Sequence, residues 1–297
     1  MRQAPLTAGE TRTRLRAIGL FCLALALFSA LDACAKYASR SVPAMEVVWI
    51  RFFGQALLAV VFLRPWRSPA LYGSKRPVLQ LVRSVLLFSS TILNFLALKH
   101  LQLAETITIT FASAFVVAGL AVPLLGEWIG PRRWAAICVG FIGVLIVARP
   151  GPEGIQPAIL FSIASMFCYS GYFLTTRMLA SSDSAEGMLL YPALAALVLL
   201  APFSLPDAVL PPSPGVAVAL ALTGVCGAAG HWCLIHAHRL TSAGVLSPFI
   251  YLQIVWMIAL GYVVFGDVPH ELTLVGAAIV IASGLYILYR ERVHGDR

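Results

Sequence analysis

The sequence predicts an all-α membrane protein in which ten transmembrane helices form two inverted five-helix repeats around a central cavity. Three observations carry this prediction. The 297-residue chain is 60% hydrophobic and only 11% charged, whereas soluble domains carry about 25% charged residues. Its apolar residues fall into ten runs, each near the ~20 residues that cross a bilayer. A weak internal similarity relates the first five runs to the last five.

The apolar runs are continuous rather than alternating, which favours helices over barrel strands. Lipid offers no partners to backbone groups, so each helix must satisfy its own. Pro248 lacks an N–H and predicts a bend in the ninth helix. The predicted spans are 15–38, 44–63, 77–98, 102–124, 131–148, 157–179, 185–203, 214–238, 242–265 and 270–289.

The basic residues gather in every second loop between these spans. Fifteen of the 21 lysines and arginines fall on one side of the predicted topology. Because positive residues stay in the cytoplasm, both termini (1–14 and 290–297) are predicted to be cytoplasmic. This placement accounts for the net charge of +8, so no nucleic-acid partner is expected. The sequence predicts an integral multi-pass protein of the cytoplasmic (inner) membrane.

The two predicted repeats cover 15–148 and 149–289. Ala104 precedes Glu127 by 23 residues and Ala243 precedes Asp267 by 24, and each acidic residue follows a glycine at the end of an apolar helix. Since five is odd, the repeats enter the membrane in opposite senses. Glu127 is therefore predicted on the cytoplasmic face and Asp267 on the external face. Inverted repeats are typical of secondary transporters, although duplication retained only for folding gives the same pattern.

Three motifs in each half resemble the EamA-type repeat of the drug/metabolite transporter superfamily. Two EamA-like units with ten helices would cover nearly the whole chain. Ala114 stands where the family often has proline, and Asp267 stands where glutamate is commoner. The motifs are Ala104–Val147 with Gly126-Glu127 and Gly140-Phe-Ile-Gly143, and Ser247–Trp256 with Phe265-Gly-Asp-Val-Pro269 and Gly276–Gly284.

This resemblance implies a secondary transporter that works by alternating access around a central cavity. It implies export of amino acids or similar small metabolites across the cytoplasmic membrane. Uptake of a metabolite such as S-adenosylmethionine or riboflavin is the alternative. The direction of transport rests on the resemblance alone, and energy coupling by protons or by exchange is left open.

Charged residues within apolar spans are costly and usually face a cavity or a partner. Asp32 and Lys36 are four residues apart on the first helix, so they share a face. Glu46 and Arg51 enter the membrane from the same side on the second helix. These four residues predict an ion-pair cluster at the external mouth, which either locks an outer gate or lets Asp32 contact substrate or a proton. Arg83 is expected to extend toward the cytoplasmic interface.

Polar and aromatic residues at mid-depth are the candidate substrate contacts. They lie on the third, fourth, sixth, eighth and ninth helices, mostly three or four residues apart. With few formal charges, they suit a small zwitterionic or neutral solute. His231 among them either titrates near neutral pH or is satisfied between helices. The candidates are Ser90, Thr91, Asn94, Thr110, Ser113, Ser165, Tyr169, Tyr172, His231, Trp232, Ser247 and Tyr251.

Several classes of function find no support in the sequence. HExxH, GxSxG and P-loop motifs are absent, so neither an intramembrane enzyme nor direct use of ATP is expected. The six cysteines lie within predicted spans and form no CxxC pair, so no metal or cofactor is expected. The expected partners are a small-molecule substrate and the lipid bilayer, with the chain a monomer or a weak homo-oligomer.

Overall fold

The computed structural model describes residues 8–63, 73–125, 131–148, 156–179, 182–241 and 243–294, and within these ranges every regular element is a helix. The first repeat contains α1 (Ala8–Ala38), α2 (Ala44–Leu63), α3 (Pro77–Leu98), α4 (Leu103–Phe111), α5 (Ser113–Leu125) and α6 (Pro131–Ala148). The second contains α7 (Pro157–Leu179), α8 (Ala185–Ser204), α9 (Pro214–Leu240), α10 (Ala243–Leu246), η3 (Ser247–Tyr251), α11 (Leu252–Leu260), η4 (Gly261–Phe265) and α12 (Glu271–His294).

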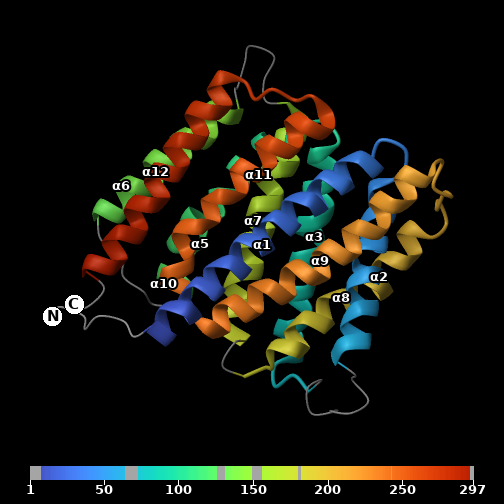
Figure 1. The fold of residues 1–297 in the computed structure, drawn as a ribbon, viewed down its shortest axis with the longest axis horizontal. Coiled ribbons are helices and arrows are strands. Elements are labelled where there is room, and N and C mark those ends of the chain that lie inside the picture. Colours follow the sequence, from blue (N-terminus) through green and yellow to red (C-terminus); the bar gives the residue numbers. More distant parts are fainter. Residues whose placement is uncertain are drawn as a thin grey trace.

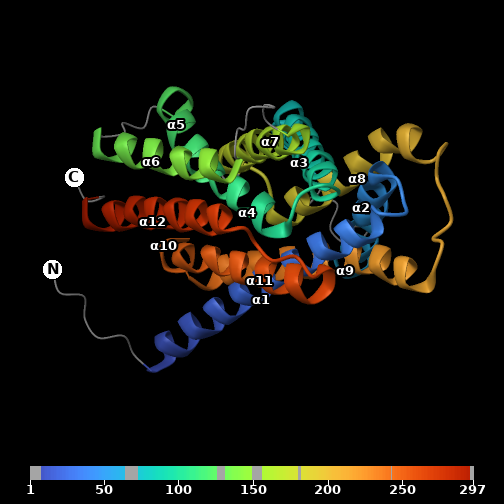
Figure 2. The ribbon, with the colours of Figure 1, turned by 90° about the horizontal axis from the view of Figure 1, so that it is seen from above.

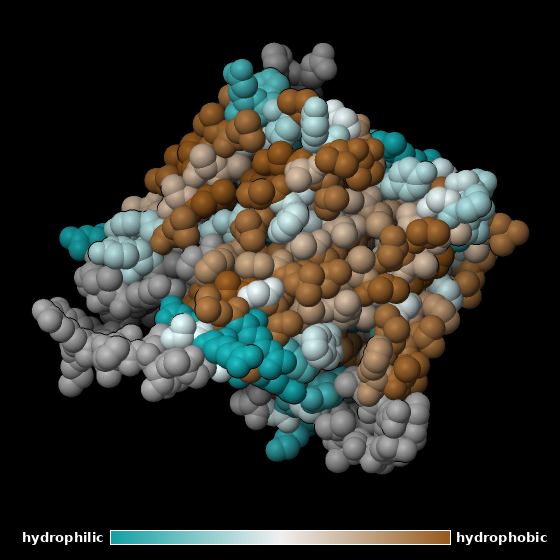
Figure 3. Space-filling model, in the orientation of Figure 1, coloured by the Kyte–Doolittle hydropathy of each residue, from teal (hydrophilic) through white to brown (hydrophobic). Residues whose placement is uncertain are grey.

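The ten-helix prediction is confirmed. Six of the described helices are long and apolar enough to cross a membrane, and shorter apolar helices occupy the remaining four spans. Large apolar side chains are exposed along these helices, as expected for a surface that faces lipid. On the face formed by α1, α9, α11 and α12, a broad apolar surface separates hydrophilic residues near the ends of the bundle (Figure 3).

Local sequence explains where several helices begin. Proline stands in the first turn of α3 and of α9, where its missing N–H leaves no intrahelical bond unmade. Ser213 caps α9 by accepting a hydrogen bond from the Val216 amide, and Ser184 caps α8 in the same way from Gly187. These caps place the short loops at the two ends of the bundle.

The helix pairing is symmetric under exchange of the two repeats. The most extensive pairs are α1 with α9 and α3 with α7, so the first helix of each repeat packs against the third helix of the other. Equivalent helices also pair with each other, α2 with α8, α4 with α11 and α6 with α12. As a result, α1, α9, α10 and α11 lie on one side of the bundle and α3, α5, α6 and α7 on the other (Figure 2).

The contact between α6 and α12 shows that the repeats are inverted. Ser283 Oγ donates to the Ala136 carbonyl, while farther along the pair Gly143 faces Gly276. Rising numbers on α6 therefore meet falling numbers on α12, and the two equivalent helices are antiparallel. In keeping with this inversion and five helices per repeat, α1 begins and α12 ends at the same end of the bundle (Figure 1).

The fourth helix of each repeat is interrupted, which the continuous spans 102–124 and 242–265 did not predict. Between α4 and α5 the chain makes a turn at Ala112. Thr108 and Thr110 each donate to the carbonyl four residues back, a bond that competes with helix geometry and bends helices. In the second repeat, the bend predicted at Pro248 takes the form of the 3-10 helix η3.

The two interruptions meet inside the bundle. Phe111 ends α4 and Tyr251 ends η3, and their rings pack edge to face with centroids 5.2 Å apart. Glycines on α6 and α12, the last helix of each repeat, leave space for aromatic rings of the interrupted helices. Gly140 on α6 lies against Phe115 of α5, and Gly284 on α12 lies against Tyr251 of η3. Interrupted helices of this kind are where secondary transporters build their binding sites.

Candidate functional site

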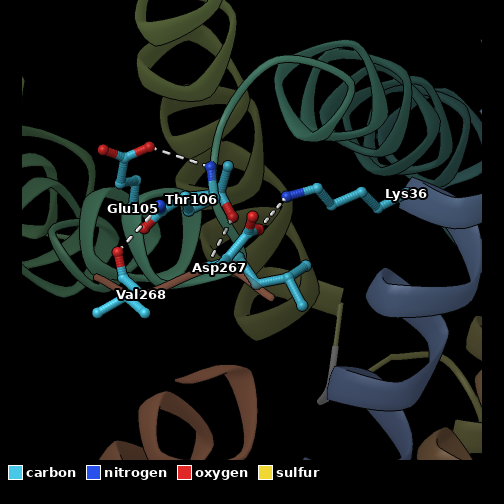
Figure 4. A network of polar contacts seen from close by, with 7 residues as sticks. Lys36, Glu105, Thr106, Asp267 and Val268 are labelled. Carbon is cyan, nitrogen blue, oxygen red and sulfur yellow. Dashed lines mark hydrogen bonds and ion pairs between the residues drawn. The ribbon is translucent and has the colours of Figure 1, made fainter. Parts of the chain in front are cut away.

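One end of the bundle carries a set of contacts between the two repeats, formed by Lys36, Gln102, Phe265, Asp267 and Val268. We call this set the outer latch, after the external position that the sequence predicts for Asp267. Lys36 Nζ lies 2.6 Å from Asp267 Oδ2, with 9% and 25% of the two side chains exposed. Figure 4 shows Lys36 extending from α1 toward Asp267 in the loop that follows η4. The pair joins the first repeat to the second.

The local chain geometry places Asp267 beside Lys36. Gly266 has φ +70°, a left-handed conformation that favours glycine, and its amide bonds back to Tyr262 O. This turn ends η4 and directs the following residues across the end of α1. Lys36 and Arg40 both lie over the Phe265 ring, 4.8 and 4.9 Å from its centroid. Cation–π contact thus supports the ion pair.

The start of α4 completes the outer latch. Gln102 Nε2 donates to the Val268 carbonyl at 3.2 Å. The same glutamine is the N-cap of α4. Its backbone N–H donates to Glu105 Oε2 at 3.0 Å, which forms half of a capping box (Figure 4). The outer latch therefore ties both α1 and α4 of the first repeat to the 266–268 loop of the second.

The predicted cluster of Asp32, Lys36, Glu46 and Arg51 is divided in the structure. Lys36 pairs with Asp267, while Glu46 Oε2 accepts a hydrogen bond from the Val209 amide at 3.0 Å. No ion pair within the four occurs among the described residues. The reason is that Lys36 lies in the last turn of α1, within reach of the second repeat's loop. The external position predicted for Asp267 was the signal for this pairing.

Asp32 and Arg51 lie deeper and each contacts α3. Asn94 Nδ2 donates to Asp32 Oδ1 at 3.2 Å, and Arg51 Nη1 lies 3.5 Å from Thr91 Oγ1. Thr91 and Asn94 are three residues apart and share a face of α3. Asp32 and Arg51 therefore contact the same face of α3, and no direct hydrogen bond joins them among the described contacts.

The helices α3 and α7 bring several candidate residues together. The hydroxyls of Ser90 and Ser165 lie 3.2 Å apart, and Ser165 also donates to the Ser90 carbonyl. Both serines are buried, so they fasten the two helices to each other. Tyr169 and Tyr172 continue the stripe along α7, with ring centroids 5.9 Å apart.

Arg83 corrects the expectation that it extends to the interface. It is only 3% exposed, and all three guanidinium nitrogens donate. Nε binds Thr176 Oγ1 at 2.6 Å, Nη1 binds the Met188 carbonyl at 2.8 Å, and Nη2 binds the Tyr172 hydroxyl at 3.1 Å. Because α7 and α8 supply these acceptors, the side chain stays inside the bundle and holds Tyr172 in place.

The remaining candidates are more scattered. Thr110 bonds its own helix, and Ser113 opens α5 directly after the turn at Ala112. His231 packs edge to face on Phe28 at 5.0 Å, whereas the neighbouring Trp232 is 52% exposed and stacks on His236. Trp232 therefore lies away from the interior. The side chain of Ser247 and the Gly126-Glu127 motif lie outside the described residues.

At the opposite end of the bundle, Asp183 links loops of the two repeats. Ser74 Oγ donates to its Oδ2 at 2.6 Å, and the Lys75 amide donates to its Oδ1 at 3.3 Å. Partial burial raises the pKa of this carboxyl, but the hydrogen bonds from Ser74, Ser182 and Lys75 outweigh it and hold the pKa below its ordinary value of 3.8. Among the described residues, no group of three or more His, Cys, Asp or Glu could hold a metal ion.

Comparison with known proteins places this arrangement among transporters. A model described as the EamA-like transporter family matches residues 15–149 and 156–289. The S-adenosylmethionine uptake transporter of Rickettsia conorii is 28% identical over 95% of both chains. The riboflavin transporter of Vibrio cholerae is 32% identical over 55% of both chains, and the pseudopaline exporter of Pseudomonas aeruginosa is 26% identical over 89% of this chain and 93% of that protein.

A solved crystal structure shares the fold. It superposes with a TM-score of 0.64, covers 97% of this chain and 100% of its own, and is 17% identical. At this level of identity the likeness supports the fold and carries no information on substrate.

Proposed function

Since the chain belongs to the EamA-like transporter family, we propose that it carries a small zwitterionic metabolite across the cytoplasmic membrane by alternating access. The repeats 15–148 and 149–289 are the two units whose relative motion exposes a shared interior to one side and then to the other. The relatives are named as transporters, and no step of chemical conversion is part of this proposal.

The observation that carries the proposal is the outer latch. Lys36 and Asp267 come from different repeats, and their ion pair is strong enough to hold one end closed yet can be broken without disturbing a helix. We propose that the latch lies on the external face, with both termini in the cytoplasm, as the distribution of basic residues predicts. The structure would then be in a form closed to the outside.

The interior offers polar groups suited to a small solute. We propose that the substrate contacts partly exposed side chains near the interrupted helices and the stripe on α7, while the buried serines hold helices together. Asn94, Tyr172, His231 and Tyr251 are partly exposed side chains on α3, α7, α9 and η3. Of the predicted contacts, Ser90, Thr91, Thr110, Ser113, Ser165 and Tyr169 flank these residues on α3, α4, α5 and α7.

We propose S-adenosylmethionine uptake as the first activity to test, because the relatives with that name match 95% of the chain. The purified protein is reconstituted in liposomes, and uptake of labelled S-adenosylmethionine is measured without ATP. Saturable flux, with counterflow driven by unlabelled compound, is the expected result. Asp32→Asn and wild type are compared across pH, since loss of pH dependence in the variant would assign proton coupling to that carboxyl.

Export of amino acids or related zwitterions is the second candidate, favoured by the pseudopaline exporter, which matches 89% of this chain. Inside-out and right-side-out vesicles loaded with amino acids separate the two directions. Flux of amino acids without flux of S-adenosylmethionine would replace the first candidate by the second. If neither group of compounds, nor riboflavin, shows saturable flux, the proposed substrate class is wrong.

A further inference from the structure

Two side chains on α2 are buried with a polar atom left over. Arg51 is 5% exposed and Gln55 2%, and among the described residues neither Arg51 Nε nor Gln55 Oε1 has a hydrogen-bond partner. The two residues are four apart and therefore share a face of α2. A buried donor and a buried acceptor without hydrogen bonds cost free energy, so these two atoms are candidates for binding a polar ligand.

Both atoms face the same glycine on α9. A Cβ built on Gly227 would lie 3.9 Å from Arg51 Nε and 3.9 Å from Gln55 Oε1. Leu31 of α1 bounds the same gap at 3.2 Å. The helices α2 and α9 touch at Gly54 and Gly224, one turn away, so the glycine at 227 continues a seam of close contact in which the polar pair lies beside the α9 backbone.

The open donor of Arg51 is not a general property of buried arginines in this bundle. Arg83 is equally buried on the neighbouring helix α3, and each of its three nitrogens has an acceptor. Arg51 makes one hydrogen bond, to Thr91 at the limiting distance of 3.5 Å. A purely structural role would be expected to satisfy the Arg51 guanidinium as it satisfies that of Arg83.

The surrounding charges favour an added anionic group. Beyond the first and last turns of the described helices, the formally charged side chains that are buried or partly buried are Asp32, Arg51 and Arg83. Two cations against one carboxylate leave a positive excess in a medium that penalises unpaired charge. Asp32, held by Asn94, contacts the same face of α3 as Arg51, which contacts Thr91.

We propose that Arg51 and Gln55, facing Gly227, bind the α-amino-acid head of the transported molecule. The carboxylate accepts from Arg51 Nε, and the ammonium group donates to Gln55 Oε1, with Asp32 as a second acceptor for it. A donor beside an acceptor is the complement of a zwitterion, whose two groups have the opposite roles. This inference rests on the proposed transport function and names the part of the substrate that the protein recognises.

The test compares zwitterions with the amines that remain when the carboxylate is removed. Binding of S-adenosylmethionine and decarboxylated S-adenosylmethionine, and of methionine and 3-methylthiopropylamine, is measured on purified full-length protein. In whichever pair binds, wild type is expected to have an affinity for the zwitterion that is on the order of 10- to 100-fold higher than its affinity for the amine. This is the effect of one charge-assisted hydrogen bond.

Three variants separate recognition from structure. Arg51→Gln is expected to abolish most of this preference while leaving amine binding nearly unchanged. Gln55→Leu removes the acceptor for the ammonium group, which both ligands carry, and is expected to weaken the zwitterion and the amine alike. Gln55→Glu adds a negative charge at the same place and is expected to shift the preference toward the amine. Ser162→Ala removes another buried hydroxyl that lacks a partner, on α7, and serves as the matched control with unchanged preference.

The outcomes distinguish this inference from the function on which it rests. If wild type transports a zwitterion but Arg51→Gln keeps its preference over the amine, and Gln55→Leu binds both ligands as wild type does, the inference is wrong. If wild type binds no zwitterion of the panel, the inference fails together with the proposed substrate class. Each variant is checked for monodispersity, and the shift in Gln55→Glu tests the inference even when Arg51→Gln fails to fold.

Discussion

Asp183 shows how a single carboxylate can join the two repeats. It lies in the loop between α7 and α8 and accepts hydrogen bonds from Ser74, Ser182 and the Lys75 amide. These bonds favour the ionised form, so the pKa lies below 3.8 although partial burial opposes the shift. A depressed carboxyl pKa means that the stabilisation is present above the unfolded pKa and is lost as the pH falls through the folded one.

We therefore expect Asp183→Asn to lower the stability of the detergent-solubilised protein at neutral pH by about 1 kcal/mol, a modest value because the loop faces solvent. The difference in melting temperature between wild type and variant should shrink as the pH falls below 3.8, the ordinary pKa of the carboxyl, and disappear once the pH has passed through the lower pKa of folded Asp183. Asp207→Asn, an exposed loop aspartate, is the matched control. A difference that persists unchanged at low pH would contradict this assignment.

At the level of residues, the sequence identified most of the chemistry but few of the partners. Lys36 and Asp267 were both placed on the external side, yet their pairing depends on where α1 ends and on the turn at Gly266. Arg83 was misread because its sequence position, near a helix end, says nothing about the acceptors that α7 and α8 bring to it. Hydrogen-bond partners across helices are a product of packing.

Among the elements, the interrupted fourth helices depend on the small residues beside them. The Tyr251 ring enters the space over Gly284 on α12, where a methyl group would overlap the tyrosine hydroxyl. The contact fixes the position of η3, and through the Phe111 ring it reaches α4. The close approach of the Tyr251 ring to the α12 backbone therefore requires glycine at position 284.

Gly284→Ala should therefore displace Tyr251 and destabilise the protein by about 1–3 kcal/mol, the usual cost of an added carbon in a packed interior. The melting temperature of the purified protein measures this effect. Gly19→Ala is the matched control, because a Cβ there meets nothing within 4 Å. Equal melting temperatures for the two variants would show that η3 can move aside at no cost.

Element number and length were predictable because hydropathy alone sets them in a bilayer. The interruption at Ala112 was not, since the run from Leu103 to Leu125 is apolar apart from Glu105 in its first turn, three threonines and a serine. A signal did exist in Thr106, Thr108 and Thr110, whose hydroxyls all bond back to helix carbonyls. Hydropathy does not register that competition.

For the whole molecule, we expect the outer latch to set the balance between conformations. Lys36→Met or Asp267→Asn removes one partner of an ion pair that joins the repeats, so the form closed at that end should lose on the order of tenfold in population. Spin labels on Ser41→Cys and His270→Cys should then report a longer distance component. The double variant Lys36→Asp with Asp267→Lys should restore the short distance, and an unchanged distribution in the single variants would exclude a gating role.

The orientation of the bundle gives a separate prediction. Asp207 and Lys75 lie in loops at opposite ends of the bundle. Asp207 lies two residues before Val209, whose amide donates to Glu46, and the Lys75 amide donates to Asp183. In a cysteine-free background, Asp207→Cys should react with a membrane-impermeant maleimide in intact cells, and Lys75→Cys only after lysis. Reaction of Lys75→Cys in intact cells would reverse the proposed topology and place the outer latch on the cytoplasmic side.

The overall architecture was predictable from the alternation of basic loops and from the odd number of helices per repeat. Both features can be counted along the sequence without knowledge of packing. The exchange of partners, in which α1 packs on α9 and α7 on α3, did not follow. It arises because each repeat leaves its first and third helices with faces that only the other repeat covers. Sequence patterns within one copy do not reveal contacts between copies.

The meeting of the two interrupted helices at Phe111 and Tyr251 has an evolutionary consequence. In the proposed alternating access, exchanging the conformations of the two repeats converts a form open to one compartment into a form open to the other. Two identical repeats would make these forms equal in energy, so sequence differences between the repeats decide which form is more populated. Gly143 and Gly284 hold matching places in the duplication but face different neighbours, Gly276 and Tyr251. Divergence at such matched pairs lets selection tilt the carrier toward either compartment without redesigning the fold.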